Sequence, residues 1–471
     1  MKKITLLLSL LLLSALLSAQ DLTGSWYGAL QIQGTTLRVV FNVSTAGSGY
    51  TSTMDSPDQG VRGIPTSNTN ITDNIITIEI PNIGINYKGT FLPNSNIIKG
   101  IFKQGTINLP LTLSKSSENI TTKIKPSKRP QDPTDFPYKQ EEVTFKNVKA
   151  GNQLSGTLTL PTSGKVSKIV VLISGSGPQN RDEEIQQFNH RPFLVWSDWL
   201  TREGIAVLRY DDRGVGKSTG QQATATSADF ADDAEAAVTY ISQRPDLKGL
   251  SIGLLGHSEG GMIAPMVAVR NPLVKFMVLL AGPGVHISEL MIKQNSAQMR
   301  LGGAPDSVIS STSAANKNIF DAVSSYKGLN AVDFKAKMDS VLYNAFQSDQ
   351  TGKPSPEKIE QLVSKNSSSL NSPWFRYFIT FNPADYLTKV KCPVLAINGT
   401  LDSQVTSEEN LNGIKASLIR AKNKKFEIVP LPGLNHLLQK ATTGSVTEYA
   451  QISETVNPIA LQKVSDWIEG L

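Results

Sequence analysis

The sequence predicts an α/β fold: a doubly wound, mostly parallel sheet with a helical cap, preceded by a small all-β, barrel-like domain. In residues 20–114, short runs rich in β-branched residues are separated by Gly, Asn, Ser and Pro, which is typical of antiparallel strands. From residue 138 onward, near-continuous apolar runs alternate with helical segments, as in a parallel sheet covered on both faces. We therefore expect domains at 20–114 and 138–471, joined by a Pro-containing linker at 115–137.

The N-terminus predicts a cleaved secretory signal peptide at residues 1–19. Lys2 and Lys3 precede an apolar run, and Ser18-Ala19 supplies the small residues that cleavage requires. The run is shorter than the roughly 20 apolar residues of a membrane-spanning helix, so we expect no membrane span. With Cys392 as its single cysteine, the chain can form no internal disulfide, which suits a secreted or periplasmic bacterial protein.

Charge and motif spacing argue against nucleic-acid, nucleotide and metal binding. The 46 basic and 40 acidic residues leave a formal charge of only +6, and the basic cluster at 123–129 is typical of a solvated linker. Gly216-Lys217-Ser218 imitates the end of a phosphate-binding loop, but Asp211 stands where that motif needs glycine. The charged run 181–184 is interpreted as a solvated loop, and no metal-ligand spacing is present, so we predict no cofactor.

The predicted all-β domain has a Gly-x-Trp sequence near its start, followed by short strands. Residues 21–26 resemble the Gly-x-Trp opening of small lipocalin-like barrels, and Trp26 is expected to plug the core rather than stack on a ligand. A barrel and a sandwich both fit the pattern. The clearest predicted strands are Leu37–Val43, Ile75–Ile80, Ile97–Phe102 and Ile107–Leu113.

The α/β domain is predicted from two leading strands, six buried strands and one long insertion. Phe230–Gln243 carries apolar residues at helical spacing. Residues 284–390 contain helical patterns without a strand of the sheet type, and an insertion of this size is best explained as a cap over the site. The predicted strands are Glu142–Phe145, Leu154–Leu160, Lys168–Ile173, Ile205–Tyr210, Ser251–Leu255, Phe276–Leu280, Val394–Ile397 and Phe426–Val429.

The most informative motif is the G-x-S-x-G sequence of residues 256–260. It follows the strand Ser251–Leu255 and precedes an apolar helical pattern, which is the context of a nucleophile elbow. The sharp turn requires small residues two positions before and after the serine. Ser258 is therefore the predicted nucleophile.

A serine nucleophile needs a base and an acid that orients the base. Of the four histidines, His436 follows the last predicted strand, where such a sheet delivers its base. Asp402 follows the strand Val394–Ile397 and fits the chain order serine, acid, histidine. Asp385 is the competing acid, but it follows Pro383 and is better placed to cap a helix.

The oxyanion of an acyl-transfer intermediate needs two backbone N–H donors. The first predicted donor is Glu259, directly after the nucleophile. The second comes from the glycine-containing loop 174–178, with Ser176 preferred and Gly177 next.

With these residues placed, 138–471 resembles the α/β-hydrolase superfamily, in particular the serine aminopeptidase-like branch that includes many bacterial esterases. The stretches 211–218 and 256–261 match the D-x-R-G-x-G-x-S turn and the elbow of that branch. The resemblance implies an eight-stranded, mostly parallel sheet, a helical cap, and Ser258, Asp402 and His436 as a catalytic triad. Secreted members often have His-Gly in the oxyanion loop, where this chain departs with Ser174-Gly175.

The resemblance extends over residues 175–193 and implies that Arg181, Asp182 and His190 brace the oxyanion loop. The function that follows is a secreted serine hydrolase that cleaves a small ester or acylated substrate through an acyl-enzyme. A serine aminopeptidase or amidase is the nearest alternative and would need an acidic pocket, to which Glu183, Glu184 or a cap residue could contribute. A non-enzymatic envelope- or carbohydrate-binding protein is the third, and the sequence gives no indication of the oligomeric state.

Overall fold

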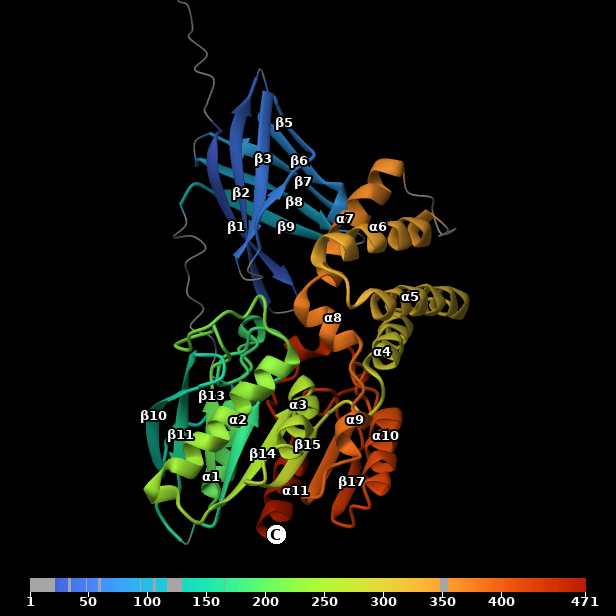
Figure 1. The fold of residues 1–471 in the computed structure, drawn as a ribbon. Coiled ribbons are helices and arrows are strands. Elements are labelled where there is room, and N and C mark those ends of the chain that lie inside the picture. The colour runs from blue at the N-terminus through green and yellow to red at the C-terminus, as the bar shows by residue number, and fades with distance from the viewer. Residues whose placement is uncertain are drawn as a thin grey trace, which may run out of the picture. The chain divides into compact units, whose positions relative to one another are not determined.

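The computed structural model describes residues 22–471 except 33–34, 48, 58–60, 94, 105–106, 117–128, 165 and 348–354. The predicted signal peptide, residues 1–19, and much of the predicted linker lie outside the described residues. The chain divides into two compact units, Met1–Pro126 and Ser127–Leu471 (Figure 1).

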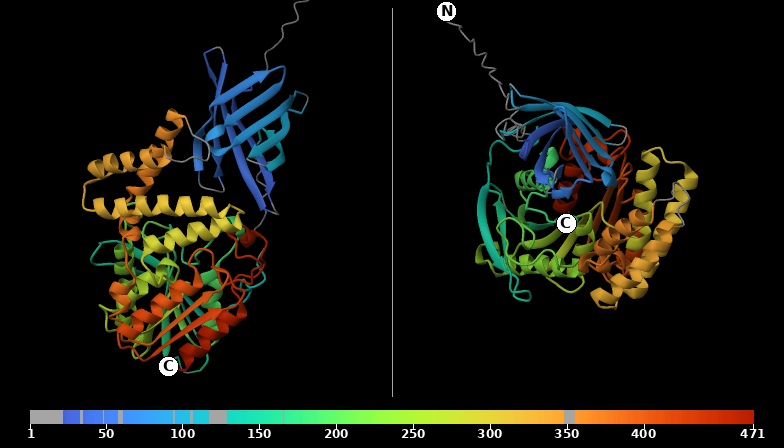
Figure 2. Two further views of the ribbon diagram at one scale, coloured as in Figure 1. Left: turned by 90° about the vertical axis from the view of Figure 1, so that its right-hand side faces the viewer. Right: turned by 90° about the horizontal axis from the view of Figure 1, so that it is seen from above.

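The first unit is one nine-stranded antiparallel sheet in the order β4-β3-β2-β1-β9-β8-β7-β6-β5. The sheet curls (Figure 2), and the Ser52 hydroxyl on β3 lies 2.7 Å from that of Thr69 on β5. Trp26 is fully buried among the inward-facing side chains, and its indole N–H donates to the Leu22 carbonyl at 2.8 Å. The strands are β1 Gly24–Ile32, β2 Thr35–Ala46, β3 Gly49–Ser56, β4 Val61–Pro65, β5 Asn68–Thr72, β6 Ile75–Ile80, β7 Ile85–Leu92, β8 Ile97–Gln104 and β9 Ile107–Ser114.

The second unit contains an eight-stranded sheet in the order β10-β11-β13-β12-β14-β15-β16-β17. The pairings of β10 with β11 and of β11 with β13 are antiparallel, and all the others are parallel. This is the eight-stranded, mostly parallel sheet that the family resemblance implies. The strands are β10 Lys139–Lys146, β11 Gln153–Leu160, β12 Lys168–Ile173, β13 Ala206–Tyr210, β14 Ser251–His257, β15 Val274–Leu280, β16 Val394–Gly399 and β17 Phe426–Leu431.

Helices cover both faces of this sheet because alternate strand residues point into different cores. Val170 and Leu172 of β12 pack with helices α1 and α11, whereas Val171 and Ile173 pack with α2, α3 and α10. In Figure 1, α2 and α3 lie in front of the sheet. The covering helices are α1 Pro192–Arg202, α2 Ser227–Gln243, α3 Glu259–Ala268, α10 Ser407–Arg420 and α11 Pro458–Glu469.

The cap is inserted between β15 and β16. Between residues 284 and 390, where the sequence predicts the insertion, its described residues contain helices and no strand. Within the described part of the chain, no helix combines the length and apolarity that a membrane crossing requires. The cap helices are α4 Ile287–Leu301, α5 Asp306–Tyr326, α6 Ala331–Gln347, α7 Pro356–Leu370, α8 Pro373–Ile379 and α9 Ala384–Leu387.

Candidate active site

Ser258 stands on a strained turn between β14 and α3. Its backbone has φ 53° and ψ −117°, a left-handed conformation that L-residues rarely adopt, and its N–H donates to the Leu280 carbonyl at 2.9 Å. The glycines of the motif are steric requirements. A Cβ on Gly256 would lie 2.1 Å from the Gly260 carbonyl oxygen, and one on Gly260 would lie 2.0 Å from that of Ile173. The turn is therefore built as a nucleophile elbow requires.

His436 and Asp402 form a buried hydrogen-bonded pair. His436 follows β17 and Asp402 follows β16, and His436 Nδ1 lies 2.8 Å from Asp402 Oδ2. The second carboxylate oxygen of Asp402 accepts the N–H groups of Gln404 and Val405, both at 2.8 Å. A carboxylate that only accepts fixes the histidine proton on Nδ1, so Nε2 of the neutral ring is left to act as a base.

Asp385, the competing acid, has a different place. It lies in the first turn of α9, and its N–H donates to the Asn382 carbonyl. The carboxylate hydrogen-bonded to His436 is thus Asp402. Among the described residues, the Ser258 hydroxyl makes no hydrogen bond, and catalytic hydrogen bonds are often long before substrate binds.

The loop 174–178 lies directly against the nucleophile. A Cβ on Gly175 would be 3.2 Å from the Cβ of Ser258, so the close approach depends on glycine. The Gly175 N–H is occupied, because it donates to Glu183 Oε1 at 2.7 Å. Within the described structure, the N–H groups of Ser176 and Glu259 have no protein acceptor, which leaves both predicted oxyanion donors available.

Asp212 holds both ends of the oxyanion loop. One carboxylate oxygen accepts the Ser174 hydroxyl and the other accepts the Gln179 N–H, each at 3.0 Å. Burial raises the pKa of Asp212 to about 8, although these two hydrogen bonds act to lower it. Asp212 is not among the predicted site residues, because in the sequence it is one residue of a charged turn.

The Glu259 side chain joins three parts of the site. Its carboxylate is buried and accepts the Ser176 hydroxyl at 2.6 Å, the Ser227 hydroxyl at 2.6 Å and the Trp374 indole N–H at 3.0 Å. These donors come from the oxyanion loop, the start of α2 and cap helix α8, respectively. Burial raises the pKa of Glu259, although its hydrogen bonds lower it. The cap is therefore attached to the residue that follows the nucleophile.

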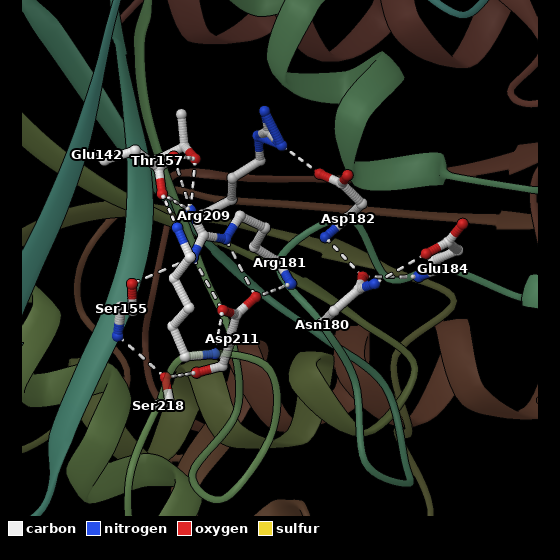
Figure 3. Close-up of polar contacts among 11 residues, drawn as sticks. Glu142, Ser155, Thr157, Asn180, Arg181, Asp182, Glu184, Arg209, Asp211 and Ser218 are labelled. Carbon is white, nitrogen blue, oxygen red and sulfur yellow. Dashed lines mark hydrogen bonds and ion pairs between the residues drawn. The ribbon is translucent and has the colours of Figure 1, made fainter.

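The charged run 181–184 is not the solvated loop expected from its composition. Arg181 makes hydrogen bonds to both oxygens of Asp211 and reaches Glu142 and Thr157 on neighbouring strands (Figure 3). Asp182 pairs with Arg209 of β13. A run of charges is solvated only where remote elements supply no partners, and here the sheet supplies them.

His190 behaves differently from the brace that the resemblance implies. Its ring is buried, and in the described structure neither ring nitrogen has a hydrogen-bond partner. Burial lowers its pKa to about 3, with smaller contributions from Arg129 and His257, so the ring is neutral. The bracing contact is instead made by its backbone, which pairs with Ile185.

Comparisons with known proteins find similarity to a serine aminopeptidase family and to esterases. Residues 189–336 match the family described as "Serine aminopeptidase, S33". Esterase EstD of Thermotoga maritima is 29% identical over 168 residues, which are 35% of this chain and 37% of that protein. The bifunctional esterase/perhydrolase DCH of Acinetobacter calcoaceticus is 25% identical over 280 residues, 54% of this chain and 86% of that protein. The chain thus spans well under half the length of the Thermotoga relative.

A solved structure of an esterase from Pyrococcus furiosus aligns with 72% of this chain and 95% of its own, at 17% identity and a TM-score of 0.42. The family match contains Ser258 and its elbow, and the sheet order places that elbow after a central parallel strand. The sheet topology, the elbow and the family match over residues 189–336 together support an α/β-hydrolase superfamily member.

Proposed function

We propose that the protein is a serine esterase that cleaves carboxylic esters through an acyl-enzyme. The observation that carries the proposal is the convergence of Ser258 on its strained turn, the His436–Asp402 pair and the oxyanion loop at the carboxyl edge of one sheet. Ester cleavage at neutral pH needs a nucleophile, a base and donors for the oxyanion, and these residues supply all three.

In the proposed reaction, Ser258 Oγ attacks the ester carbonyl carbon as His436 Nε2 takes the hydroxyl proton. The oxyanion that develops is held by the N–H groups of Ser176 and Glu259. As the intermediate collapses, the carbon–oxygen bond to the alcohol breaks and His436 returns its proton to the leaving oxygen. Water then repeats the sequence on the acyl-enzyme, releasing the acid and restoring the Ser258 hydroxyl.

The acidic side chains around the site favour an ester over an aminopeptidase substrate. Glu183 accepts from Gly175 and faces His257, and Glu259 accepts three donors. Glu184 is bonded to Asn180. A pocket for a substrate amine requires an accessible carboxylate with a free acceptor position. Both oxygens of Glu259 are engaged, and the remaining oxygen of Glu183, Oε2, is buried, so neither residue offers one.

The test is a parallel rate measurement on short-chain p-nitrophenyl esters and aminoacyl p-nitroanilides, with Ser258→Ala as the control. We expect ester turnover that disappears in the variant. Faster cleavage of the anilides by the unaltered protein would establish an aminopeptidase instead. If the folded protein turns over neither, the esterase proposal fails for these acyl groups.

We further propose that the enzyme acts in the bacterial periplasm or outside the cell. The support is the sequence of residues 1–19, with its two lysines, apolar run and small residues before Gln20. Mass spectrometry of the intact protein from a secreting bacterial host tests this. We expect a mature chain that begins at Gln20, and an intact Met1 in the cytoplasmic fraction would contradict the proposal.

A further inference from the structure

Glu183 and His257 form a second buried acid–histidine pair beside the proposed triad. His257 Nδ1 lies 2.9 Å from Glu183 Oε1, and His257 Nε2 lies 3.1 Å from the backbone carbonyl of His436. Both side chains are buried, with relative exposures of 7% for Glu183 and 10% for His257. The pair takes no part in the proposed reaction, although His257 directly precedes Ser258.

The partners of His257 define where its protons lie. A carbonyl oxygen can only accept, so Nε2 carries a proton and donates it to His436. Nδ1 faces a carboxylate, which favours a second proton there. Burial acts to lower the pKa of His257, but the charge and hydrogen bond of Glu183, the His436 carbonyl and the Asp402 charge together leave the pKa raised. Both ring nitrogens of His257 therefore face hydrogen-bond acceptors, Glu183 Oε1 and the His436 carbonyl.

The pair connects the two loops whose alignment the reaction requires. On one side, Glu183 Oε1 also accepts the Gly175 N–H at 2.7 Å, next to the proposed oxyanion donor Ser176. On the other side, His257 holds the main chain of the proposed base, and the His257 and His436 rings lie 4.9 Å apart between centroids. The oxyanion loop, residues 174–178, and the segment after β17 that carries His436, termed the base loop, are thus both fixed to the end of β14.

The position of Glu183 is itself enforced by the network in Figure 3. Glu183 has φ 51°, a conformation that non-glycine residues rarely adopt. The two residues before it are fixed to the sheet by the pairs Arg181–Asp211 and Asp182–Arg209. These ion pairs hold a strained backbone turn that directs the carboxylate inward.

We propose that Glu183 and His257 are positioning residues that hold the oxyanion loop and the base loop in register around Ser258. This inference rests on the proposed function, since it assigns a role within the same site. Misplacement of a reacting group by about 1 Å can cost a factor of about 100 in rate. Loss of the pair should therefore reduce the chemical step more than substrate binding.

The experiment compares Glu183→Gln, His257→Gln and the double variant on p-nitrophenyl acetate. Rates are expressed per active site, titrated with an organophosphonate that labels Ser258, so that misfolded protein does not count. Glu184→Gln is the matched control, because this neighbouring carboxylate bonds only to Asn180 among the described residues. Melting midpoints are measured for all four variants.

We expect each single variant to lose about 10- to 100-fold in kcat per titrated site, with KM within about threefold of the unaltered value. The double variant should be no slower than the more damaging single one, because the two residues act as one unit. Glu184→Gln should retain full activity. Independent, multiplicative losses in the double variant, or single variants as fast as Glu184→Gln, would overturn the inference.

The labelling step separates this inference from the proposed function. If the unaltered protein is not labelled, or if Ser258→Ala is still labelled, the serine-esterase proposal has failed. The positioning inference, which depends on that proposal, then fails as well. If labelling depends on Ser258 but the Glu183 and His257 variants turn over normally, only the positioning role is wrong.

Discussion

Ser258 and Asp402 are held by opposite means, and each means suits one chemical role. Ser258 has a strained backbone and a hydroxyl with no bond of its own within the described residues, which leaves it free to react. The Asp402 carboxylate accepts two backbone N–H groups and contacts His436, so its position is fixed and both its oxygens are hydrogen-bonded. A group so fully bonded orients its neighbour and does not itself react.

Substitutions of Ser258, Asp402 and Asp385 test these two roles. Ser258→Ala should reduce kcat by about 10⁶, and Asp402→Asn by about 10⁴, because asparagine would hold His436 in the wrong tautomer. Asp385→Asn, at the start of α9, should stay within about twofold of the unaltered enzyme. Steady-state kinetics on p-nitrophenyl esters measure all three. A larger loss in Asp385→Asn than in Asp402→Asn would refute the acid assignment.

The buried Asp212 predicts a dependence of stability on pH. Its folded-state pKa of about 8 is above the usual 3.8, so the folded chain binds this proton more tightly than the unfolded chain does. Its contribution to stability is therefore greatest at low pH and is lost as pH rises toward 8. Asp212→Asn lacks this titration, so it should gain about 3 kcal/mol relative to the unaltered protein between pH 6 and pH 9.

Urea unfolding of both proteins at pH 6 and pH 9 measures that difference. The comparison uses the change between pH values, which cancels any constant cost of placing an asparagine beside Ser174 and Gln179. Parallel pH profiles for the two proteins would show that Asp212 is ionised throughout this range.

Among the elements, the elbow depends most on the absence of side chains. Gly260→Ala would place a methyl group 2.0 Å from the Ile173 carbonyl oxygen, against backbone that cannot move without displacing β12. We expect the free energy of unfolding to fall by about 1–3 kcal/mol, the usual cost of overpacking. Gly328→Ala is the control, because a Cβ there meets nothing within 4 Å. Equal melting midpoints for the two variants would disprove the steric argument.

The attachment of the cap to α3 is the second element-scale prediction. Trp374→Phe keeps an aromatic ring on α8 but removes the N–H that Glu259 accepts. A hydrogen bond to a charged group contributes about 1.5–3 kcal/mol, so kcat/KM should fall about tenfold, mainly through KM. Trp199→Phe is the matched control, because it also removes an indole N–H hydrogen bond, the one to Ser465 between α1 and α11. Equal kinetics for both variants would exclude a role for the attachment.

The elements themselves could largely be predicted from local pattern. Ile75–Ile80 and Lys168–Ile173 are observed with the predicted bounds, because alternating or continuous apolar runs report directly on burial. Strands such as β3 and β5 were not predicted, since they are rich in Ser, Thr and Asn and gain their place from neighbours.

The site residues also differ in whether local pattern could predict them. The positions of Ser258, Asp402 and His436 followed from strand ends and chain order. Glu183 was named only as a possible contributor to an amine pocket. Its pairing with His257 could not be predicted, because His257 is 74 residues away and a charged loop gives no local sign of burial.

At the scale of the whole molecule, the two units have separate cores. The first unit packs around Trp26, and the second packs on the two faces of its own sheet. Arg129 and Gln131, which the sequence assigned to the linker, lie within the second unit and hydrogen-bond to its Ile452 and Val456 carbonyls. The second unit therefore needs its leading residues, and truncations should differ according to which side of Arg129 they fall on.

A chain that begins at Ser127 keeps these contacts, whereas one that begins at Tyr138 loses them. We expect the longer form to hydrolyse p-nitrophenyl acetate within about twofold of the full chain, because every proposed site residue lies in the second unit. The shorter form should melt several degrees lower, since it leaves partly buried carbonyl groups such as those of Ile452 and Val456 without these donors. If the Ser127 form folds with an unchanged melting midpoint but has lost ester turnover, the first unit contributes to the site. If it retains ester turnover but acts more weakly on acylated polymers, the first unit directs the enzyme to its substrate.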